Sequence, residues 1–267
     1  MPGDRLERLY ADLRGRGLNP WLGLKEILQL DFLRVFYRLP GSEEVVLQGG
    51  GALHFAYGSP RLSVDLDFVH QSSRLQELVE SSAEQLRRCV ESDIGLSPDI
   101  EITRRGERLM RAKVRAPLGR NRVISCSLEF YRLRSLQPQT RPLIDLPDLS
   151  IRVESPSEIL ADKIVANLDR ARRGFLKMRD VYDIWFLRER LGQSLDMELV
   201  REKLADYGVE AGEEEFQFIG VSLRYGVEEL ESSLRGYLPA HELEGVRAEE
   251  IIRVAAELFD ECRGELL

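Results

Sequence analysis

The stretch VVLQGGGALHFAYGSPRLSVDLDF, residues 45–68, decides the fold of this 267-residue chain. It begins with a short apolar run that is typical of a buried strand and stops at three glycines, residues 49–51. Residues 52–57 then have helical composition. Residues 62–69 alternate strictly between polar and apolar side chains, which predicts a second strand. We therefore expect a strand, a glycine turn, a short helix and another strand.

The second strand carries the chemistry of this stretch. Its alternation would place Ser63, Asp65 and Asp67 on one face. Two neighbouring carboxylates repel each other and are costly in a packed interior, and a divalent cation relieves both costs. Mg²⁺ prefers carboxylate oxygens and keeps positions open for phosphates, while backbone N–H groups at Gly49 and Gly50 suit a phosphate at a helix N-terminus. The pattern predicts a site for Mg²⁺ and a nucleoside triphosphate.

A third carboxylate is expected on a neighbouring strand. Residues 111–116 and 123–130 alternate as strands do, with a turn predicted at 119–121. Ser125, Ser127 and Glu129 would share one face of the later strand, which would bring Glu129 beside the two aspartates. A solvent-facing strand carboxylate is the alternative interpretation of Glu129.

The segment GGGALHFAYGSPRLSVDLDF resembles the AbiEii/AbiGii family of nucleotidyltransferase toxins, within the DNA polymerase beta-like superfamily. A GG-x-AL turn and an R-x-S-x-DLDF strand are the hallmark of that family, and the resemblance covers roughly residues 45–187. It implies an α+β fold, with a mixed sheet and flanking helices followed by a C-terminal helical domain. The proline-punctuated segment 141–148, read as a loop, places the expected domains at 1–147 and 148–267.

The resemblance also implies an activity, namely Mg²⁺-dependent transfer of a nucleotide from an NTP to an acceptor. The expected acceptor is tRNA, and the expected partner is an antitoxin protein. Asp65, Asp67 and Glu129 would hold the metal. The triphosphate would lie among Gly49, Gly50 and Ser63, and two cations, Arg61 and Lys163, would neutralise the charge that develops.

A second pair of segments fits the same family. A helix carrying a lysine, EILADKIVANLDR, precedes an R-D-x-x-D segment, MRDVYDIWFL. By resemblance, Lys163 contacts the nucleotide phosphates and Asp180 is a functional acid near the acceptor, while the role of Asp183 stays open. The alternative is structural, in which Arg173 or Arg179 simply pairs with one of these aspartates.

Composition limits the other classes of function. The net charge of −8 argues against a generic DNA-coating protein. It also differs from the positive charge expected of a protein whose acceptor is RNA. Residues 102–122 and 170–179 are nevertheless basic, and either contact an RNA backbone or are solvated faces. No apolar run reaches the length of a membrane helix, so we expect a cytoplasmic protein without membrane contact. Transfer to a protein or a small molecule, and a catalytically idle nucleotide-binding module, are the alternatives.

Periodicity and turn residues predict the remaining elements. The expected helices are 4–18, 22–37, 73–92, 159–173, 195–207, 216–231 and 248–262. Ser155, Pro156 and Glu158 form the expected start of the helix that carries Lys163, with a capping box between Ser155 and Glu158.

Overall fold

The computed structural model describes residues 2–119, 121–245 and 247–267, with side chains described from residue 6 onward. Arg120, in the turn expected at 119–121, lies outside these residues. The chain forms two compact units. The first extends to Glu154 and includes Gly236–Ala240, and the second comprises Ser155–Arg235 and His241–Leu267. The boundary expected at residue 147 falls inside the last strand of the first unit, which is hydrogen-bonded into the sheet.

The first unit is built around one mixed sheet. Within the described residues this sheet has seven strands in the order β3-β4-β5-β2-β1-β7-β6. The strands are β1 (Val45–Gln48), β2 (Leu66–His70), β3 (Asp99–Arg105), β4 (Leu109–Pro117), β5 (Val123–Tyr131), β6 (Pro138–Leu143) and β7 (Leu146–Glu154). The central strand β2 runs antiparallel to β1 and parallel to β5, so two segments far apart in sequence meet at the middle of the sheet.

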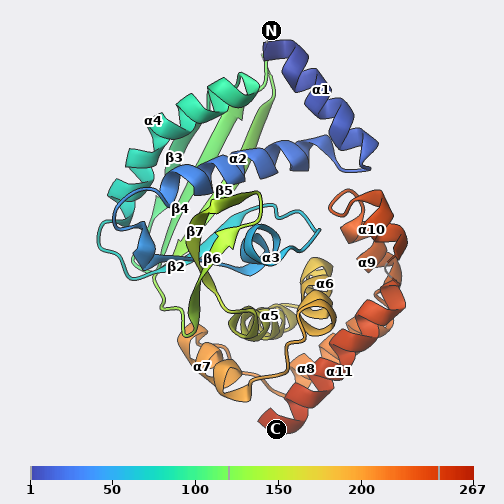
Figure 1. The fold of residues 1–267 in the computed structure, drawn as a ribbon. Coiled ribbons are helices and arrows are strands. Elements are labelled where there is room, and N and C mark those ends of the chain that lie inside the picture. Colours follow the sequence, from blue (N-terminus) through green and yellow to red (C-terminus); the bar gives the residue numbers. More distant parts are fainter. Residues whose placement is uncertain (1, 120, 246) are drawn as a thin grey trace. The chain divides into compact units, whose positions relative to one another are not determined.

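Helices cover the apolar face of this sheet. The helices of this unit are α1 (Pro2–Gly15), α2 (Pro20–Phe36), η1 (Ser42–Glu44), α3 (Gly49–Tyr57) and α4 (Leu75–Ile94), and Figure 1 shows α4 running beside the strands and α2 lying across them. The rings of Phe68 on β2 and Phe130 on β5 stack at 4.7 Å and meet Phe32 and Phe36 of α2. Burial of these aromatic rings fixes which face of β2 and β5 points inward. Asp67 and Glu129, one residue away on each strand, are therefore on the opposite face.

Two expectations for this unit were wrong. The strand expected over 62–69 begins only at Leu66, because the Ser63 hydroxyl donates a hydrogen bond to the carbonyl of Asp65 and makes a local turn. The segment expected as a loop at 141–148 contains the second half of β6 and the start of β7. The prolines in this segment were the reason for expecting a loop. However, β6 is the outermost strand of the sheet, and an edge strand tolerates proline.

The second unit is helical throughout its described residues. Its helices are α5 (Pro156–Ala171), α6 (Met178–Trp185), η2 (Phe186–Arg190), α7 (Met197–Tyr207), α8 (Glu213–Arg224), α9 (Val227–Leu234) and α11 (Ala248–Leu266), with α10 (Ala240–Gly245) starting at the last residue of the first unit. The helix expected over 216–231 is split into α8 and α9. The chain turns at Gly226, where a Cβ atom would come within 2.7 Å of the Met178 side chain. The mixed sheet with flanking helices, followed by helices, is confirmed.

None of the helices in the described part of the chain is both long and apolar enough to cross a membrane.

Candidate active site

Asp67 lies at the centre of the polar face of the sheet. On β2 it is in register with Gln48 of β1 on one side and with Glu129 of β5 on the other. Directly opposed residues on neighbouring strands share a face and have their Cβ atoms about 5 Å apart. The structure therefore brings Asp67 and Glu129 side by side, as the alternation on the two strands predicts.

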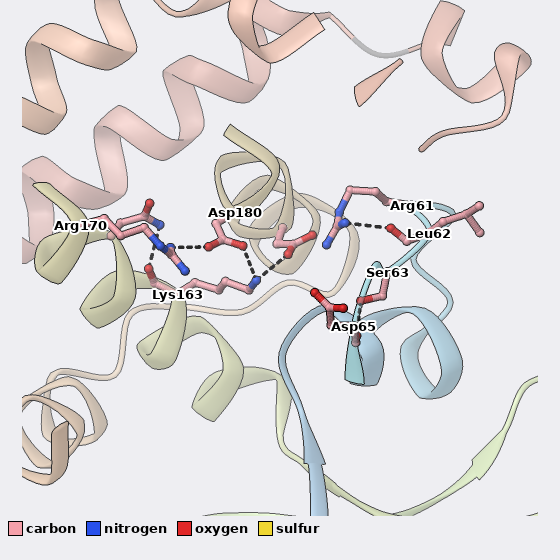
Figure 2. Close-up of polar contacts among 9 residues, drawn as sticks. Arg61, Leu62, Ser63, Asp65, Lys163, Arg170 and Asp180 are labelled. Carbon is pink, nitrogen blue, oxygen red and sulfur yellow. Dashed lines mark hydrogen bonds and ion pairs between the residues drawn. The ribbon is translucent and has the colours of Figure 1, made fainter. Parts of the chain in front are cut away.

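Asp65 reaches the same face from a different backbone conformation. It precedes β2, and its Oδ1 accepts a hydrogen bond of 3.2 Å from the backbone N–H of Ser127. Ser127 is two residues before Glu129 on β5, so both aspartates lie along the same side of that strand. Figure 2 shows Ser63 turned towards the backbone of Asp65, where its hydroxyl donates to the carbonyl oxygen at 2.8 Å. In this conformation Ser63 shapes the turn that presents Asp65.

Glu129 has partners of its own. Its Oε1 is 2.9 Å from Nε of Arg111, and its Oε2 accepts a hydrogen bond from the Tyr131 hydroxyl. Burial, reinforced by this hydrogen bond and by the charge of Asp67, raises the pKa of Tyr131 well above its ordinary value, so Tyr131 remains a donor. Within the described residues no three histidine, cysteine, aspartate or glutamate side chains are grouped as metal ligands. The carboxylate of Glu129 is turned towards Arg111 and Tyr131.

The glycine turn lies directly beside Asp67. Gly49 has a φ of +64°, a conformation that favours glycine, and a Cβ built there would be 3.7 Å from Oδ2 of Asp67. At Gly51, a Cβ would be 3.0 Å from Leu66, so the absence of a side chain lets α3 pack closely against β2. Gly50 is buried in the first turn of α3. The first turn of α3, with its backbone N–H groups, is thus beside a carboxylate, and negative charge is favourable at a helix N-terminus.

Arg61, which was expected to neutralise charge at the triphosphate, is almost fully buried. Only 5% of the residue is exposed, and Nη1 donates a 2.9 Å hydrogen bond to the carbonyl of Leu62. Leu62 itself packs against Leu13, Leu18 and Leu22. Arg61 therefore belongs to the loop that leads into Asp65, and that loop is anchored in an apolar cluster of the first unit.

The second unit contains a buried ion cluster centred on Lys163, which we name the Lys163 cluster (Lys163, Arg170, Asp180 and Asp183). The Lys163 ammonium is 2.6 Å from Oδ1 of Asp180 and 2.7 Å from Oδ2 of Asp183. Arg170 bonds the second oxygen of Asp180 at 2.5 Å, and Figure 2 shows Lys163 and Arg170 converging on that carboxylate. Asp180 and Asp183 are almost fully buried. Helices α5 and α6 are tied together by these ion pairs.

The charge state of Asp180 follows from its neighbours. Burial by itself raises the pKa of Asp180, but the attraction of Lys163, Lys177 and Arg170 outweighs burial and holds this pKa well below its ordinary value. A carboxylate that binds protons so weakly is a poor general base. The sequence suggested Arg173 or Arg179 as the ion-pair partner of these aspartates, and for Arg173 this is wrong, since it pairs with Asp169 on its own helix.

Sequence reasoning missed several neighbours of the expected site residues. Arg111 was placed in a basic segment and in the expected strand 111–116, but the pairing of that strand with β5, which puts Arg111 opposite Glu129, was not used. Arg170 was assigned to a nucleic-acid contact, but it lies two helical turns after Lys163, which puts both on one face of α5.

A buried lysine of α7 was also missed. Lys203 lies 2.7 Å from Glu158 and 3.0 Å from Asp162 of α5. Ser155 caps α5 as expected by accepting a hydrogen bond from the N–H of Glu158. The Glu158 side chain, expected to close a capping box, forms an ion pair with Lys203.

The donor set on the sheet fits a hard divalent cation. Asp65 and Asp67 offer carboxylate oxygens beside the glycine turn, which are the ligands that Mg²⁺ prefers. Burial raises the pKa of Cys126 and of Cys262 to about 12, which disfavours either thiol as a nucleophile. The fold and the acidic face fit the class of nucleotidyltransferases.

The family description "Nucleotidyl transferase AbiEii toxin, Type IV TA system" matches residues 31–263, which is most of the chain. The chain belongs to this family of nucleotidyltransferase toxins of type IV toxin–antitoxin systems.

Solved structures share the fold. One is MenT4, a nucleotidyltransferase toxin (Rv2826c) from Mycobacterium tuberculosis H37Rv, with a TM-score of 0.60 and 18% identity over 98% of this chain and 93% of that chain. Another is JHP933 from Helicobacter pylori, with a TM-score of 0.56 and 18% identity over 93% of this chain and 96% of that chain. No curated protein matches the sequence of this chain.

Proposed function

We propose that the chain transfers a nucleotide from an NTP to tRNA in a Mg²⁺-dependent reaction, and that this is the basis of its toxicity. The observation that carries the proposal is the acidic face of the sheet. Asp67 is in register with Glu129, Asp65 is fixed against β5, and the glycine turn of α3 adjoins Asp67. Nucleotidyl transfer requires carboxylates and phosphate-binding N–H groups in the same place.

Each residue of the first unit has a definite task in this proposal. Asp65 and Asp67 hold the cation, and Glu129, held by Arg111 and Tyr131, adds negative charge beside Asp67. Mg²⁺, when bound, supplies charge stabilisation for the transferring phosphoryl group. Gly49 and Gly50 offer backbone N–H groups to the triphosphate, Ser63 holds the turn before Asp65, and Arg61 contributes positive charge.

In the second unit we assign Lys163 to the nucleotide phosphates. Asp180 becomes a positioning residue in this proposal, because its depressed pKa disfavours proton transfer and its oxygens hold Lys163 and Arg170. Asp183 contacts Lys163 as well and shares that task. This assignment differs from the role of functional acid that the family resemblance implied for Asp180.

The family supports an antitoxin as the partner, whereas tRNA as the acceptor is part of the proposal itself. A toxin of a toxin–antitoxin system has an antitoxin protein as its partner, and a transferase that uses NTP and tRNA acts in the cytoplasm. Addition of a nucleotide to the 3′ end of tRNA would block aminoacylation and stop translation.

The test uses the purified full-length chain with each labelled NTP in turn, Mg²⁺ and total cellular RNA. Label is expected on RNA of tRNA size, and sequencing of tRNA 3′ ends after brief expression in cells should show added nucleotides. The matched control is Asp65→Asn with Asp67→Asn, which removes the charge at constant shape and should give neither result. EDTA should likewise abolish transfer.

Two outcomes would contradict the proposal. Label on a protein or small molecule, with none on RNA, would establish the alternative acceptor. Growth inhibition that persists in the double variant would show that binding, and not nucleotide transfer, is the toxic activity.

A further inference from the structure

The basic segment 102–122 does not form one surface in the fold. Its first part, RRGERLMR at residues 104–111, makes the end of β3, the turn and the start of β4. Its last part, residues 118–122, follows the other end of β4. The remaining residues of β4 separate the two parts by about 20 Å. The segment therefore offers two separate candidate surfaces for nucleic acid and not one continuous surface.

A second arginine-rich segment joins the first of these parts. The backbone N–H of Arg132, just after β5, donates a 2.9 Å hydrogen bond to the carbonyl of Arg108 in the β3–β4 turn. Leu109 and Tyr131 are also directly paired. We name the resulting surface the arginine edge, and it consists of Arg104, Arg108, Arg132 and Arg134, all of them exposed.

The charge of the arginine edge is unusual for this protein. Residues 104–111 and 129–134 contain six arginines and two glutamates, a net charge of +4, in a chain whose net charge is −8. Arg105 turns to Gln76 of α4 and Arg111 to Glu129, so these two side chains contact other parts of the unit. The exposed positive charges of the arginine edge repel one another, and a polyanion relieves that repulsion. Guanidinium groups, with their planar donor pairs, are well suited to phosphates.

The position of the edge relates it to the acidic face. Arg132 comes three residues after Glu129 on the same chain segment, a distance of about 10 Å. Beside the edge, Arg134 and Arg152 line a cavity of about 310 Å³, whose wall also includes His70 and the acidic residues Glu43 and Glu44. This volume is at the lower end for ligand pockets. A polynucleotide bound along the edge would thus have one of its ends within a few nucleotides of Asp67.

We propose that the arginine edge binds the phosphate backbone of the acceptor RNA. This inference rests on the proposed function, which it deepens by locating the acceptor. The triphosphate of the NTP has the same chemistry as a polynucleotide backbone, so the experiment must separate the two. RNA binding is measured in the Asp67→Asn background and without NTP, so that no nucleotide is transferred during the measurement.

The decisive variant is Arg108→Glu with Arg132→Glu. Its matched control is Arg87→Glu with Arg88→Glu, which makes the same change of charge on α4, a helix on the apolar side of the sheet. Fluorescence anisotropy with a labelled tRNA transcript gives the dissociation constant over a salt titration. The edge variant should bind about tenfold more weakly or worse, and its salt dependence should lose about 1.5 units of slope, as expected for two lost phosphate contacts. The control should bind as the parent does.

The outcomes separate the two proposals. Equal tRNA affinity in the edge variant and its parent overturns the inference, as does an equal loss in the α4 control or a raised KM for the NTP with unchanged tRNA affinity. In the otherwise wild-type chain, the edge variant should raise the KM for tRNA alone. If the wild-type chain binds tRNA through this edge but transfers no nucleotide, the proposed function fails and the binding site stands.

Discussion

The two units hold their carboxylates in opposite ways. On the sheet, Asp65, Asp67 and Glu129 are partly exposed, and Glu129 retains 20% of its side-chain accessibility. In the second unit, Asp180 and Asp183 are at most 3% exposed, and Lys163 contacts both. The sheet carboxylates rest on strand pairing and a few hydrogen bonds, whereas those in the helices are neutralised by buried cations.

This difference separates carboxylates that are available to a cation from carboxylates that hold other side chains in place. A buried charge is tolerated only with a partner, so the Lys163 cluster is expected to control stability and the position of Lys163. A partly exposed carboxylate beside a glycine turn can exchange its contacts for a cation without unfolding of the unit. Variants in the two regions should therefore produce different ratios of lost activity to lost stability.

The largest expected effect is on activity and comes from Asp67→Asn. The change removes one negative charge from the acidic face and leaves the stacked Phe68 and Phe130 intact. Loss of a metal ligand costs several kcal/mol of transition-state stabilisation, so the rate of nucleotide transfer should fall about 10³-fold. The free energy of unfolding should change by less than about 1 kcal/mol. Initial rates of label transfer and urea unfolding measure the two quantities, and a rate within tenfold of wild type would contradict the assignment.

Lys163→Met should give the largest loss of stability. Methionine fills similar space but leaves two buried carboxylates without their shared cation, which should cost about 3–5 kcal/mol. The fluorescence of Trp185 on α6, followed during urea unfolding in a Trp21→Phe background, reports on the second unit.

The matched control for that variant is Lys113→Met. Lys113 is exposed on β4, so the same substitution should change stability by no more than about 0.5 kcal/mol. Equal effects of the two substitutions would show that the ion pairs of Lys163 do not hold the second unit together.

The same contrast explains what the sequence could predict. Alternation on residues 123–130 placed Glu129 on the right face, because the buried rings of Phe68 and Phe130 permit only one register. The start of β2 was wrong because a hydrogen bond from Ser63 overrides alternation, and no periodicity contains that bond. Arg111, Arg170 and Lys203 each contact a carboxylate on a different helix or strand. A local sequence pattern does not contain such contacts. Charge alone does not indicate whether an arginine is buried against Asp180 or exposed at an edge.

The pH dependence of stability should differ between the two units because each contains a buried aspartate with a shifted pKa. Burial, only partly offset by Arg34, raises the pKa of Asp31 in α2 to about 6, whereas the pKa of Asp180 is lowered. Between about pH 4 and 6 the folded first unit therefore binds a proton at Asp31 that the unfolded chain releases, and its stability falls as pH rises through this window. The contribution of Asp180 is fully present above about pH 4 and is lost only as pH falls below it.

Asp31→Asn isolates the first of these contributions. The variant should raise the free energy of unfolding at pH 7 by about 1–2 kcal/mol and leave it nearly unchanged at pH 4. Trp21 fluorescence in a Trp185→Phe background follows the first unit. A stabilisation that is the same at both pH values would show that the ionisation of Asp31 is not its cause.

The smallest effect is expected from Gly49→Ala, which tests the glycine turn itself. A φ of +64° costs a residue with a Cβ about 1 kcal/mol, and that Cβ would be in ordinary contact with Asp67 and not in a clash. Stability should fall by about 1 kcal/mol. The KM for the NTP should rise because the first turn of α3 has to shift. Gly264→Ala in α11, where φ is helical and no atom lies within 4 Å of the added Cβ, should be neutral or stabilising. If the two substitutions behave alike, the conformation of Gly49 does not constrain the turn, and the role of that turn in holding the triphosphate loses its physical basis.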